Sequence, residues 1–481
     1  MTFKFVFLWT DLALWALFLA LASYAWHAAR QPPLRATWGR AMRDSTTLGS
    51  AGVLALFVLV SALDSVHFRG ALPATAGQAS AVTFYDTRTT SLLDLLLSRP
   101  LAMRESSYSA PLSTHGLLKE NFECDGVTVR EVPRLQFGGA HLADPERDWA
   151  RDVSGRVLAG LLAGALLTLL ASIVLAVAVA REHGALLQRW RAIVRGRTRY
   201  PWRVPLATLA VIALAAGPVM ALMGHYHVFG TDRTGNDVLV QAVKSVRTAF
   251  VIGTLSTLAT VPLALGLGVL AGYFKGWVDE AVQYLYTVLT SVPNVLLIAA
   301  CVLMVQVYID THADAFDTGL ERADVKMFLL CVILGLTGWA TLCRLVRAET
   351  LKLRDLEFMQ AAEAFGVSHL RAMARHVVPN VMHLVLITTV LNFSDLILYE
   401  AVLTYVGVGV DPSLNSFGGM INLARSEMAG DPVIWWSFVA AFGFMLALVL
   451  AANLFADGVR DAFDPRSRAF RPQRAAQKNA V

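Results

Sequence analysis

The chain has 481 residues, of which 56% are apolar and only 16% are charged, and its formal net charge is +5. A nucleic-acid-binding protein would present a clustered basic face on a soluble domain, and the sequence has no such cluster. The apolar residues instead gather in long uncharged runs, for example 157–180, 204–223, 249–274 and 435–456. These runs argue against a soluble protein and for a membrane protein with a positive excess on one side.

Nine apolar segments are long enough to cross a bilayer as helices, since a helix rises about 1.5 Å per residue. In chain order they cover about 5–27, 48–66, 156–180, 204–223, 249–273, 283–306, 327–346, 380–400 and 435–456. Only helices satisfy their own backbone hydrogen bonds inside lipid when the chain forms no closed barrel. The fold class predicted is therefore an all-α polytopic membrane protein.

Lysine and arginine concentrate in four connecting segments, at 28–47, 181–203, 347–379 and in the tail after residue 460. Nine spans place all four segments on the same side of the membrane. Basic loops are typical of the cytoplasmic side. We therefore expect the N-terminus outside and the C-terminus in the cytoplasm.

One long polar segment, about 67–155, then falls outside the membrane. It contains a possible amphipathic helix at 91–101 and one or two possible strands in 127–137. Its length exceeds what is needed to join two helices, so we expect a small folded domain. It shows no catalytic pattern, and we interpret it as a cap or docking surface.

The four cysteines and eleven histidines show no spacing typical of a metal site. No cofactor bound by this chain is expected, and no metal site is predicted.

The third basic segment contains the sequence from Gln360 to Gly366, followed by a stretch that ends at Pro379. Ala361 and Ala362 have little bulk, so a helix carrying them can lie deep in a groove. Gly366 can end that helix. Pro379 can begin the next span, where its missing N–H costs nothing.

Arg371 and Arg375 lie four residues apart in the same segment and would share a helix face. They could meet acidic groups on a partner, or lipid headgroups.

This stretch resembles the "EAA loop" of permease subunits in ABC importers, whose pattern is E-A-A-x3-G-x9-I-x-L-P. The spacing fits without a gap, and Gln360, His376 and Val378 depart from the pattern. The resemblance implies a short cytoplasmic helix that sits in a cleft of a partner ATPase.

Further motifs resemble the "C-type" permeases of dipeptide, oligopeptide and nickel importers. They occur in order over the last 280 or so residues, at 229–239, 268–279, 336–339, 344–349, 405–409 and 457–466. A typical member has six spans. Here three more spans and the polar segment precede them, and no motif explains the addition.

The motif at 229–239 contributes Gly230, Asp232, Gly235 and Asp237, just outside the membrane. It is not a phosphate loop, because no Gly-Lys-Ser/Thr follows it. The two carboxylates are expected to cap the helix that follows, or else to contact a binding protein or the substrate. The family has arginine where this chain has Asn236.

Gly268 and Gly272 form a small-residue motif that allows close helix packing, either with a partner permease or within the chain. Pro293 is expected to bend the sixth span along a solute path. Asp395 and Glu400 are ionisable groups near membrane depth, with a role either in that path or at the interface.

The domain boundaries expected are 1–66 for two transmembrane helices, 67–155 for the external segment, 156–203 for a third helix with its arginine-rich loop, 204–465 for the permease domain and 466–481 for a cytoplasmic tail.

The resemblance implies the permease subunit of an ABC importer in a bacterial inner membrane, moving di- or oligopeptides by alternating access. It implies no catalytic site in this chain, with ATP and Mg on partner subunits. Implied partners are two ATPase subunits or domains, a second permease subunit, an extracytoplasmic solute-binding protein and membrane lipid.

Three alternatives stay open. Nickel or another small solute could be the cargo of a similar permease. A secondary transporter would be favoured by inverted repeats and paired buried charges, and neither is visible in the sequence. A membrane scaffold or sensor would need a cytoplasmic effector domain, and the tail after residue 465 is short.

Overall fold

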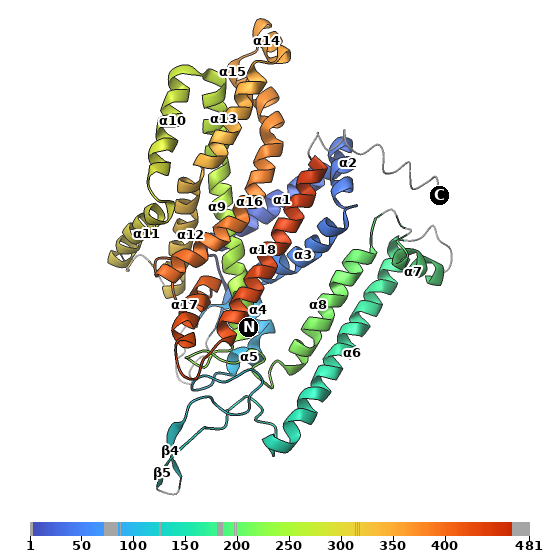
Figure 1. Cartoon of the computed structure of the whole chain (residues 1–481), viewed down its shortest axis with the longest axis vertical. Coiled ribbons are helices and arrows are strands. Elements are labelled where there is room, and N and C mark those ends of the chain that lie inside the picture. The colour runs from blue at the N-terminus through green and yellow to red at the C-terminus, as the bar shows by residue number, and fades with distance from the viewer. Residues whose placement is uncertain are drawn as a thin grey trace, which may run out of the picture. The chain divides into compact units, whose positions relative to one another are not determined.

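The computed structural model describes residues 3–71, 85–86, 88–124, 127–179, 186–196, 198, 200–312, 314, 316 and 318–463 (Figure 1). The tail predicted at 466–481 and parts of the segment 67–155 lie outside these residues. The chain divides into two compact units. Unit 1 comprises Met1–Phe7, Leu48–Thr248 and Pro412–Leu448, and unit 2 comprises Leu8–Thr47, Ala249–Asp411 and Val449–Val481.

Eight helices in the described part of the chain are long and apolar enough to cross a membrane. They are α1 (Trp9–Arg30), α3 (Ser45–Asp64), α6 (Pro145–Val179), α8 (Arg203–Leu222), α9 (Val238–Phe274), α11 (Asn294–Thr311), the run through α16 (His369–Val406) and α18 (Trp436–Phe463). A ninth span results if α12 (Gly319–Gly338) and α13 (Ala340–Arg354), bent by 42°, count as one. The all-α multi-span fold class is confirmed.

The sixth predicted span differs from the structure in its position. Helix α10 (Gly276–Ser291) ends before Pro293, and α11 starts a new hydrogen-bonded run at Asn294. Pro293 has no backbone N–H to continue α10, while its carbonyl accepts from Leu296 and Leu297 in the next helix. The break predicted inside one span therefore separates two helices.

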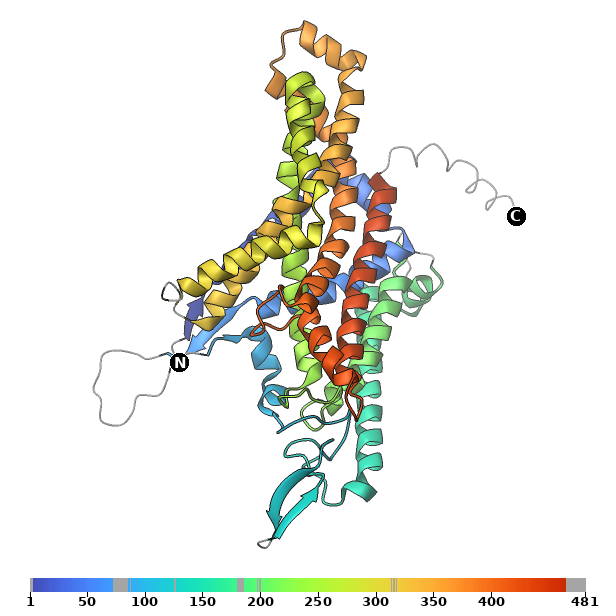
Figure 2. The same ribbon diagram turned by 60° about the vertical axis from the view of Figure 1, so that its left-hand side comes forward.

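In unit 1, α6 and α8 run side by side (Figures 1 and 2). A Cβ added to Gly160 would lie 2.5 Å from the backbone of Gly217, and one added to Gly164 would lie 2.4 Å from the carbonyl oxygen of Ala213. The absence of side chains lets the two backbones approach closely, as is typical of membrane helices. The short helix α7 (Leu186–Val194) lies between them in the sequence.

The segment 67–155 contains small elements of its own, all in unit 1. They are β2 (His67–Gly70), β3 (Thr90–Ser91), α4 (Leu92–Leu96), α5 (Ser98–Ala102), β4 (Glu120–Cys124) and β5 (Val127–Glu131). β1 (Phe3–Val6) pairs antiparallel with β2, which pairs with β3, and β4 pairs with β5. Helix α17 (Phe417–Met428) also belongs to unit 1.

Ser91 shows why α4 begins where it does. Its hydroxyl accepts from the N–H of Asp94, and the Asp94 carboxylate accepts from the N–H of Ser91, which makes a capping box. The amphipathic stretch predicted at 91–101 is therefore two short helices, α4 and α5, of which the first begins at this cap.

The first helix of the N-terminal addition packs within unit 2. The N–H of Thr10, in the first turn of α1, donates to Asp324 Oδ2 on α12 at 3.1 Å, and both residues are buried. A carboxylate at a helix N-terminus satisfies an otherwise unpaired N–H. Helix α2 (Pro32–Ala41) follows α1 in the same unit.

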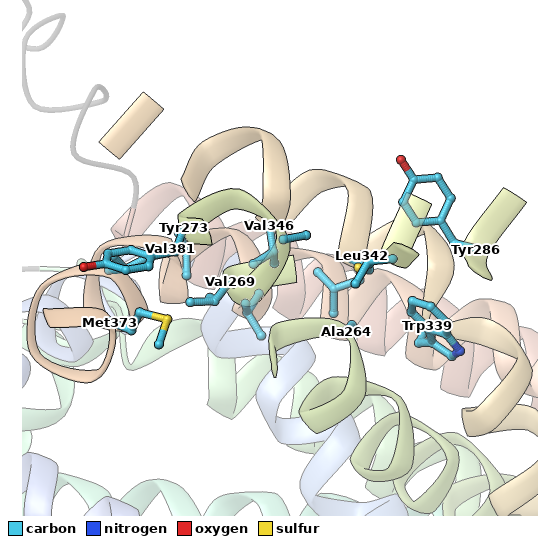
Figure 3. Packing of buried hydrophobic residues seen from close by; sticks show 14 of the residues in the cluster. Ala264, Val269, Tyr273, Tyr286, Trp339, Leu342, Val346, Met373 and Val381 are labelled. Carbon is cyan, nitrogen blue, oxygen red and sulfur yellow. The ribbon is translucent and has the colours of Figure 1, made fainter. Parts of the chain in front are cut away.

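The core of unit 2 joins α9, α10, α13 and the start of α16 (Val378–Val406) (Figure 3). Gly268 and Gly272 lie in α9 where it crosses α13. A Cβ at Gly268 would lie 2.9 Å from the carbonyl oxygen of Cys343, and one at Gly272 would lie 2.8 Å from that of Arg347. The small-residue motif therefore packs α9 against α13 of the same chain.

Candidate functional site

The loop predicted to couple to a partner is held by one buried face. It contains α14 (Glu357–Ala364), α15 (His369–Ala372) and a π-helical turn (Met373–Val377) that leads into α16. Figure 2 shows α14 and α15 at the end of α13 and α16. Met359, Met373 and Val377 are buried in the core of unit 2, so a force on the loop acts directly on packed helices.

Other residues of the loop expose large apolar side chains. Phe365 is 88% exposed and Leu370 is 76% exposed, and Leu356 and Phe358 add further apolar surface. Exposed apolar groups rimmed by polar ones are typical of protein-binding surfaces.

Gly366 ends α14 through its backbone conformation. Its φ is +71°, which favours glycine. The N–H of Gly366 donates to the carbonyl of Glu363, and the N–H of Val367 donates to that of Ala362, the paired bonds of a Schellman motif. A Cβ at Gly366 would meet nothing within 4 Å. The glycine is therefore favoured by its left-handed backbone conformation and not by a close neighbour within the chain.

The remaining coupling residues lie mostly at the surface. Gln360, Ala361, Arg371 and Arg375 are exposed and Ala362 is half-buried, while Pro379 stands in the first turn of α16. Their role toward an ATPase stays a prediction.

Two contacts attach the loop to the end of α9. The hydroxyl of Tyr273 lies 3.0 Å from Nδ1 of His369, and Lys275 Nζ lies 3.2 Å from Asp355 Oδ1. Together with the buried face, these contacts orient the loop from two sides.

An ion pair that sequence reasoning missed joins two of the motifs. Arg347 on α13 donates through Nη2 to Asp279 Oδ2 of α10 at 2.6 Å, and a second bond joins its Nε to Asp279 Oδ1. A bidentate pair fixes both position and orientation. It braces α10 against α13 beside the coupling loop.

The glycines at 230 and 235 allow another backbone to approach. Gly230 has φ +71° and Gly235 has φ +76°. A Cβ at Gly230 would lie 2.5 Å from the carbonyl oxygen of Ser109, and one at Gly235 would lie 1.9 Å from that of Glu105. Residues 105–109 of the addition therefore lie directly on this motif.

Hydrogen bonds join the two segments. The N–H of Thr231 donates to the carbonyl of Ser109 at 3.1 Å, and the N–H of Glu105 donates to the carbonyl of Gly235 at 3.0 Å. The indole N–H of Trp436 donates to the carbonyl of Thr231 at 3.0 Å. The motif and residues 105–109 thus form one hydrogen-bonded structure within unit 1.

The two carboxylates of the motif do different things. Asp237 Oδ1 accepts from the N–H groups of Leu239 and Val240 at 2.9 and 3.2 Å, so it caps α9. Asp232 accepts from the N–H groups of Thr234 and Asn236 at 2.8 and 2.9 Å, which shapes the turn before the helix.

A buried charge cluster lies beneath this motif. His227 is 0% exposed; its Nδ1 lies 2.9 Å from Asp237 Oδ2, and its Nε2 lies 3.4 Å from Glu105 Oε1 in an ion-pair contact without hydrogen-bond alignment. The Glu105 carboxylate also accepts from three successive backbone N–H groups, those of residues 136–138, at 2.9, 2.9 and 3.0 Å.

Burial disfavours the charged form of His227, but the hydrogen bond with Asp237 and the charges of Asp237 and Glu105 outweigh it and raise its pKa to about 9. Burial likewise opposes the charge on Glu105, yet the ion-pair contact with His227 and the hydrogen bonds from the backbone of residues 136–138 lower its pKa to about 2. At neutral pH the raised pKa of His227 and the lowered pKa of Glu105 favour an imidazolium beside a carboxylate.

Sequence reasoning missed both Glu105 and the role of His227. Glu105 is one of many charged residues in the segment 67–155, and His227 belongs to no recognisable pattern. Only the fold brings these two residues to within ion-pair distance.

The three residues assigned to a solute path lie in different surroundings. Pro293 separates α10 from α11, Asp395 is exposed on α16, and Glu400 is 1% exposed, with Thr404 Oγ1 donating to it at 2.8 Å. Their role in a solute path stays a prediction. In the part of the chain that the structure describes, no group of three or more potential ligands could hold a metal ion.

The fold defines a multi-span membrane protein. The family model "Binding-protein-dependent transport system inner membrane component" matches residues 264–469. The chain is 31% identical to the oligopeptide transport system permease protein OppC of Mycobacterium tuberculosis (strain H37Rv) over 294 residues, which are 58% of this chain and 94% of that protein.

It is also 31% identical to OppC of Escherichia coli (strain K12) over 245 residues, 51% of this chain and 74% of that protein. A putative peptide permease protein of Brucella suis is 28% identical over 242 residues, 50% of this chain and 74% of that protein. The chain belongs to this family of inner membrane permease components of binding-protein-dependent transport systems, and it is of the OppC type. It is a multi-pass inner membrane protein.

Proposed function

We propose that this chain is the permease subunit of an ATP-driven peptide importer, and that the loop 357–379 transmits the work of a partner ATPase. The loop is anchored by the buried side chains of Met359, Met373 and Val377, and it exposes those of Phe365 and Leu370. This combination of buried anchoring side chains and exposed apolar side chains is the observation that carries the proposal. A loop that couples two proteins must be packed firmly into one of them and present a contact surface to the other.

ATP and Mg would bind to the partner, and this chain would have no catalytic site of its own. Two ATPase subunits or domains, a second permease subunit and an extracytoplasmic solute-binding protein would complete the transporter. Peptide as cargo is supported by relatives of this chain that are oligopeptide transport system permease proteins. Alternating access of the helical domain would move the solute.

The arginine-rich segments support an orientation with the N-terminus outside and the C-terminus in the cytoplasm. In that orientation the coupling loop faces the ATPase and the motif at 230–237 faces the binding protein. The segment 67–155 would then form an external cap at this motif. Its support is the pair of hydrogen bonds that join Glu105 to Gly235 and Ser109 to Thr231, together with the close approach of Ser109 to Gly230.

Gly366→Asp tests the coupling role with little disturbance to the chain itself. Aspartate can adopt the left-handed conformation, and no atom of the chain lies within 4 Å of the new Cβ. We expect ATP-dependent uptake of a labelled dipeptide into proteoliposomes to fall at least about tenfold, because a buried unpaired charge at an interface costs more than about 1.4 kcal/mol.

Gly319→Asp is the matched control, since its Cβ also meets nothing within 4 Å and it lies outside the loop. Normal uptake by Gly366→Asp, with ATPase subunits still bound, would refute the coupling role. Failure of the unmodified complex to take up any dipeptide would refute the peptide function.

A further inference from the structure

A cavity of about 200 Å³ lies in unit 1 between the end of α5 and the beginning of α9. Met103 and Arg104 of the addition line one side, and Asn236, Gln241 and Lys244 of the permease domain line the other. A water molecule takes up about 30 Å³ in the liquid, so the cavity has room for a group the size of a small amino-acid residue. Neither part of the chain forms this cavity alone.

The position of Arg104 is set by its neighbours. Its Nε donates to the carbonyl of Thr234 at 3.1 Å. The backbone N–H of the next residue, Glu105, donates to the carbonyl of Gly235. The Glu105 carboxylate is held by its buried contacts. These contacts hold the backbone around Arg104 in place. Its ordering on ligand binding therefore costs less conformational entropy.

The other charges around the cavity are compensated. Lys244 Nζ lies 2.7 Å from Asp94 Oδ1, and the Asp237 carboxylate contacts His227 and the first N–H groups of α9. Among the ion pairs of the described residues in this region, none includes Arg104. Arg104 is therefore a lining cation that no carboxylate pairs in the part of the chain that the structure describes, while the nearby Asp232 carboxylate accepts from the side-chain amides of Gln241 and Asn236.

Arginine and lysine donors together suit a carboxylate. A guanidinium has five N–H donors, of which one serves Thr234, and an ammonium has three, so Lys244 can serve Asp94 and a ligand together. Met103, with Pro100, Leu101 and Val240, adds apolar surface for a short side chain.

We propose that this cavity binds the carboxyl-terminal end of a short peptide, with Arg104 of the N-terminal addition as the counter-charge. The proposal rests on the peptide function proposed above and makes the addition part of the solute site. It explains why the backbone at residues 104–105 is fixed so firmly to the motif at 230–237.

The test is a saturation-transfer NMR titration on the full chain with its partner subunits in lipid nanodiscs. Three probes are compared: alanyl-alanine, alanyl-alanine amide and acetate. We expect alanyl-alanine to bind at least about tenfold more tightly than the amide, since a hydrogen bond to a charged group is lost with the carboxylate. Acetate, without the peptide, should bind more weakly than alanyl-alanine.

Arg104→Gln should abolish the preference for the free carboxylate, and Arg104→Lys should retain part of it. Arg147→Gln is the matched control: it makes the same charge change in the addition, at a side chain that is 87% exposed. An unchanged melting temperature shows that each variant is folded.

Equal binding of the dipeptide and its amide, or an unchanged preference in Arg104→Gln, would overturn the proposal. Acetate binding as tightly as the dipeptide would also overturn it, because the cavity would then hold only a small anion. ATP-dependent dipeptide uptake is measured on the same samples. Uptake without a carboxylate preference defeats this inference and leaves the transport function standing.

Discussion

Gly235 lies against the backbone of Glu105, so closely that a Cβ on the glycine would be 1.9 Å from the glutamate's carbonyl oxygen. The first residue lies in the motif at 229–239 and the second in the polar segment 67–155. The pair also shares a hydrogen bond, from the N–H of Glu105 to the carbonyl of Gly235 at 3.0 Å. The addition is therefore built into the permease at this point.

Gly235→Ala should displace residues 104–109 and lower the melting temperature of the purified protein. The left-handed φ of +76° alone costs a non-glycine residue about 1–2 kcal/mol, and the collision with Glu105 adds to it. Gly70→Ala is the control, because no atom lies within 4 Å of its Cβ. A melting temperature for Gly235→Ala equal to that of the control would contradict the close contact.

The charge cluster predicts a pH dependence of stability. The pKa of His227 is raised from 6.5 to about 9 on folding, so its stabilisation is complete below pH 6.5 and is lost as the pH rises toward 9. The pKa of Glu105 is lowered from 4.5 to about 2, so its stabilisation is present above pH 4.5 and is lost as the pH falls toward 2.

Thermal unfolding of the wild-type protein should therefore shift to lower temperature between pH 6.5 and pH 9. His227→Gln should be less stable overall and show a shallower change over this range, because the titrating group is gone. Glu131→Gln, at an exposed residue, serves as the control. Parallel curves for the wild type and His227→Gln would rule out a role of His227 in this pH dependence.

Gly217→Val should separate α8 from α6. Its Cβ would lie 2.2 Å from the carbonyl oxygen of Gly160, and overpacking of this kind typically costs about 1–3 kcal/mol. Gly155→Val, on the partner helix α6, has nothing within 4 Å of its Cβ, so it should be nearly neutral. Melting temperatures in detergent compare the two, and equal values would mean that the helices do not pack through Gly217.

The proposed orientation predicts which side of the membrane each connecting segment occupies. With the native cysteines replaced, a cysteine at Lys119 should react with a membrane-impermeant maleimide on intact spheroplasts, and one at Leu187 should not. Both side chains are exposed, so burial does not limit the reaction. Labelling at Leu187 and protection at Lys119 would reverse the topology.

The spans and the end of helix α14 at Gly366 could be predicted from the sequence because their signals are local. An uncharged run of bilayer length marks a helix wherever it occurs, and all nine predicted spans meet a helix in the described chain. Gly366 ends α14 because glycine, which has no Cβ, readily adopts the left-handed conformation after a helix. The break at Pro293 was predicted for the same reason, although it separates two helices instead of bending one.

Only the tertiary structure decided what the glycines and the buried charges do. From the sequence, Gly268 and Gly272 could pack either against a partner permease or within the chain. The fold places them against α13 of the same chain. Glu105 and His227 are 122 residues apart in the sequence. They come into contact because the addition packs on the motif at 230–237. Such contacts depend on which surfaces the chain brings together, and no periodicity or spacing within either segment records the position of the other.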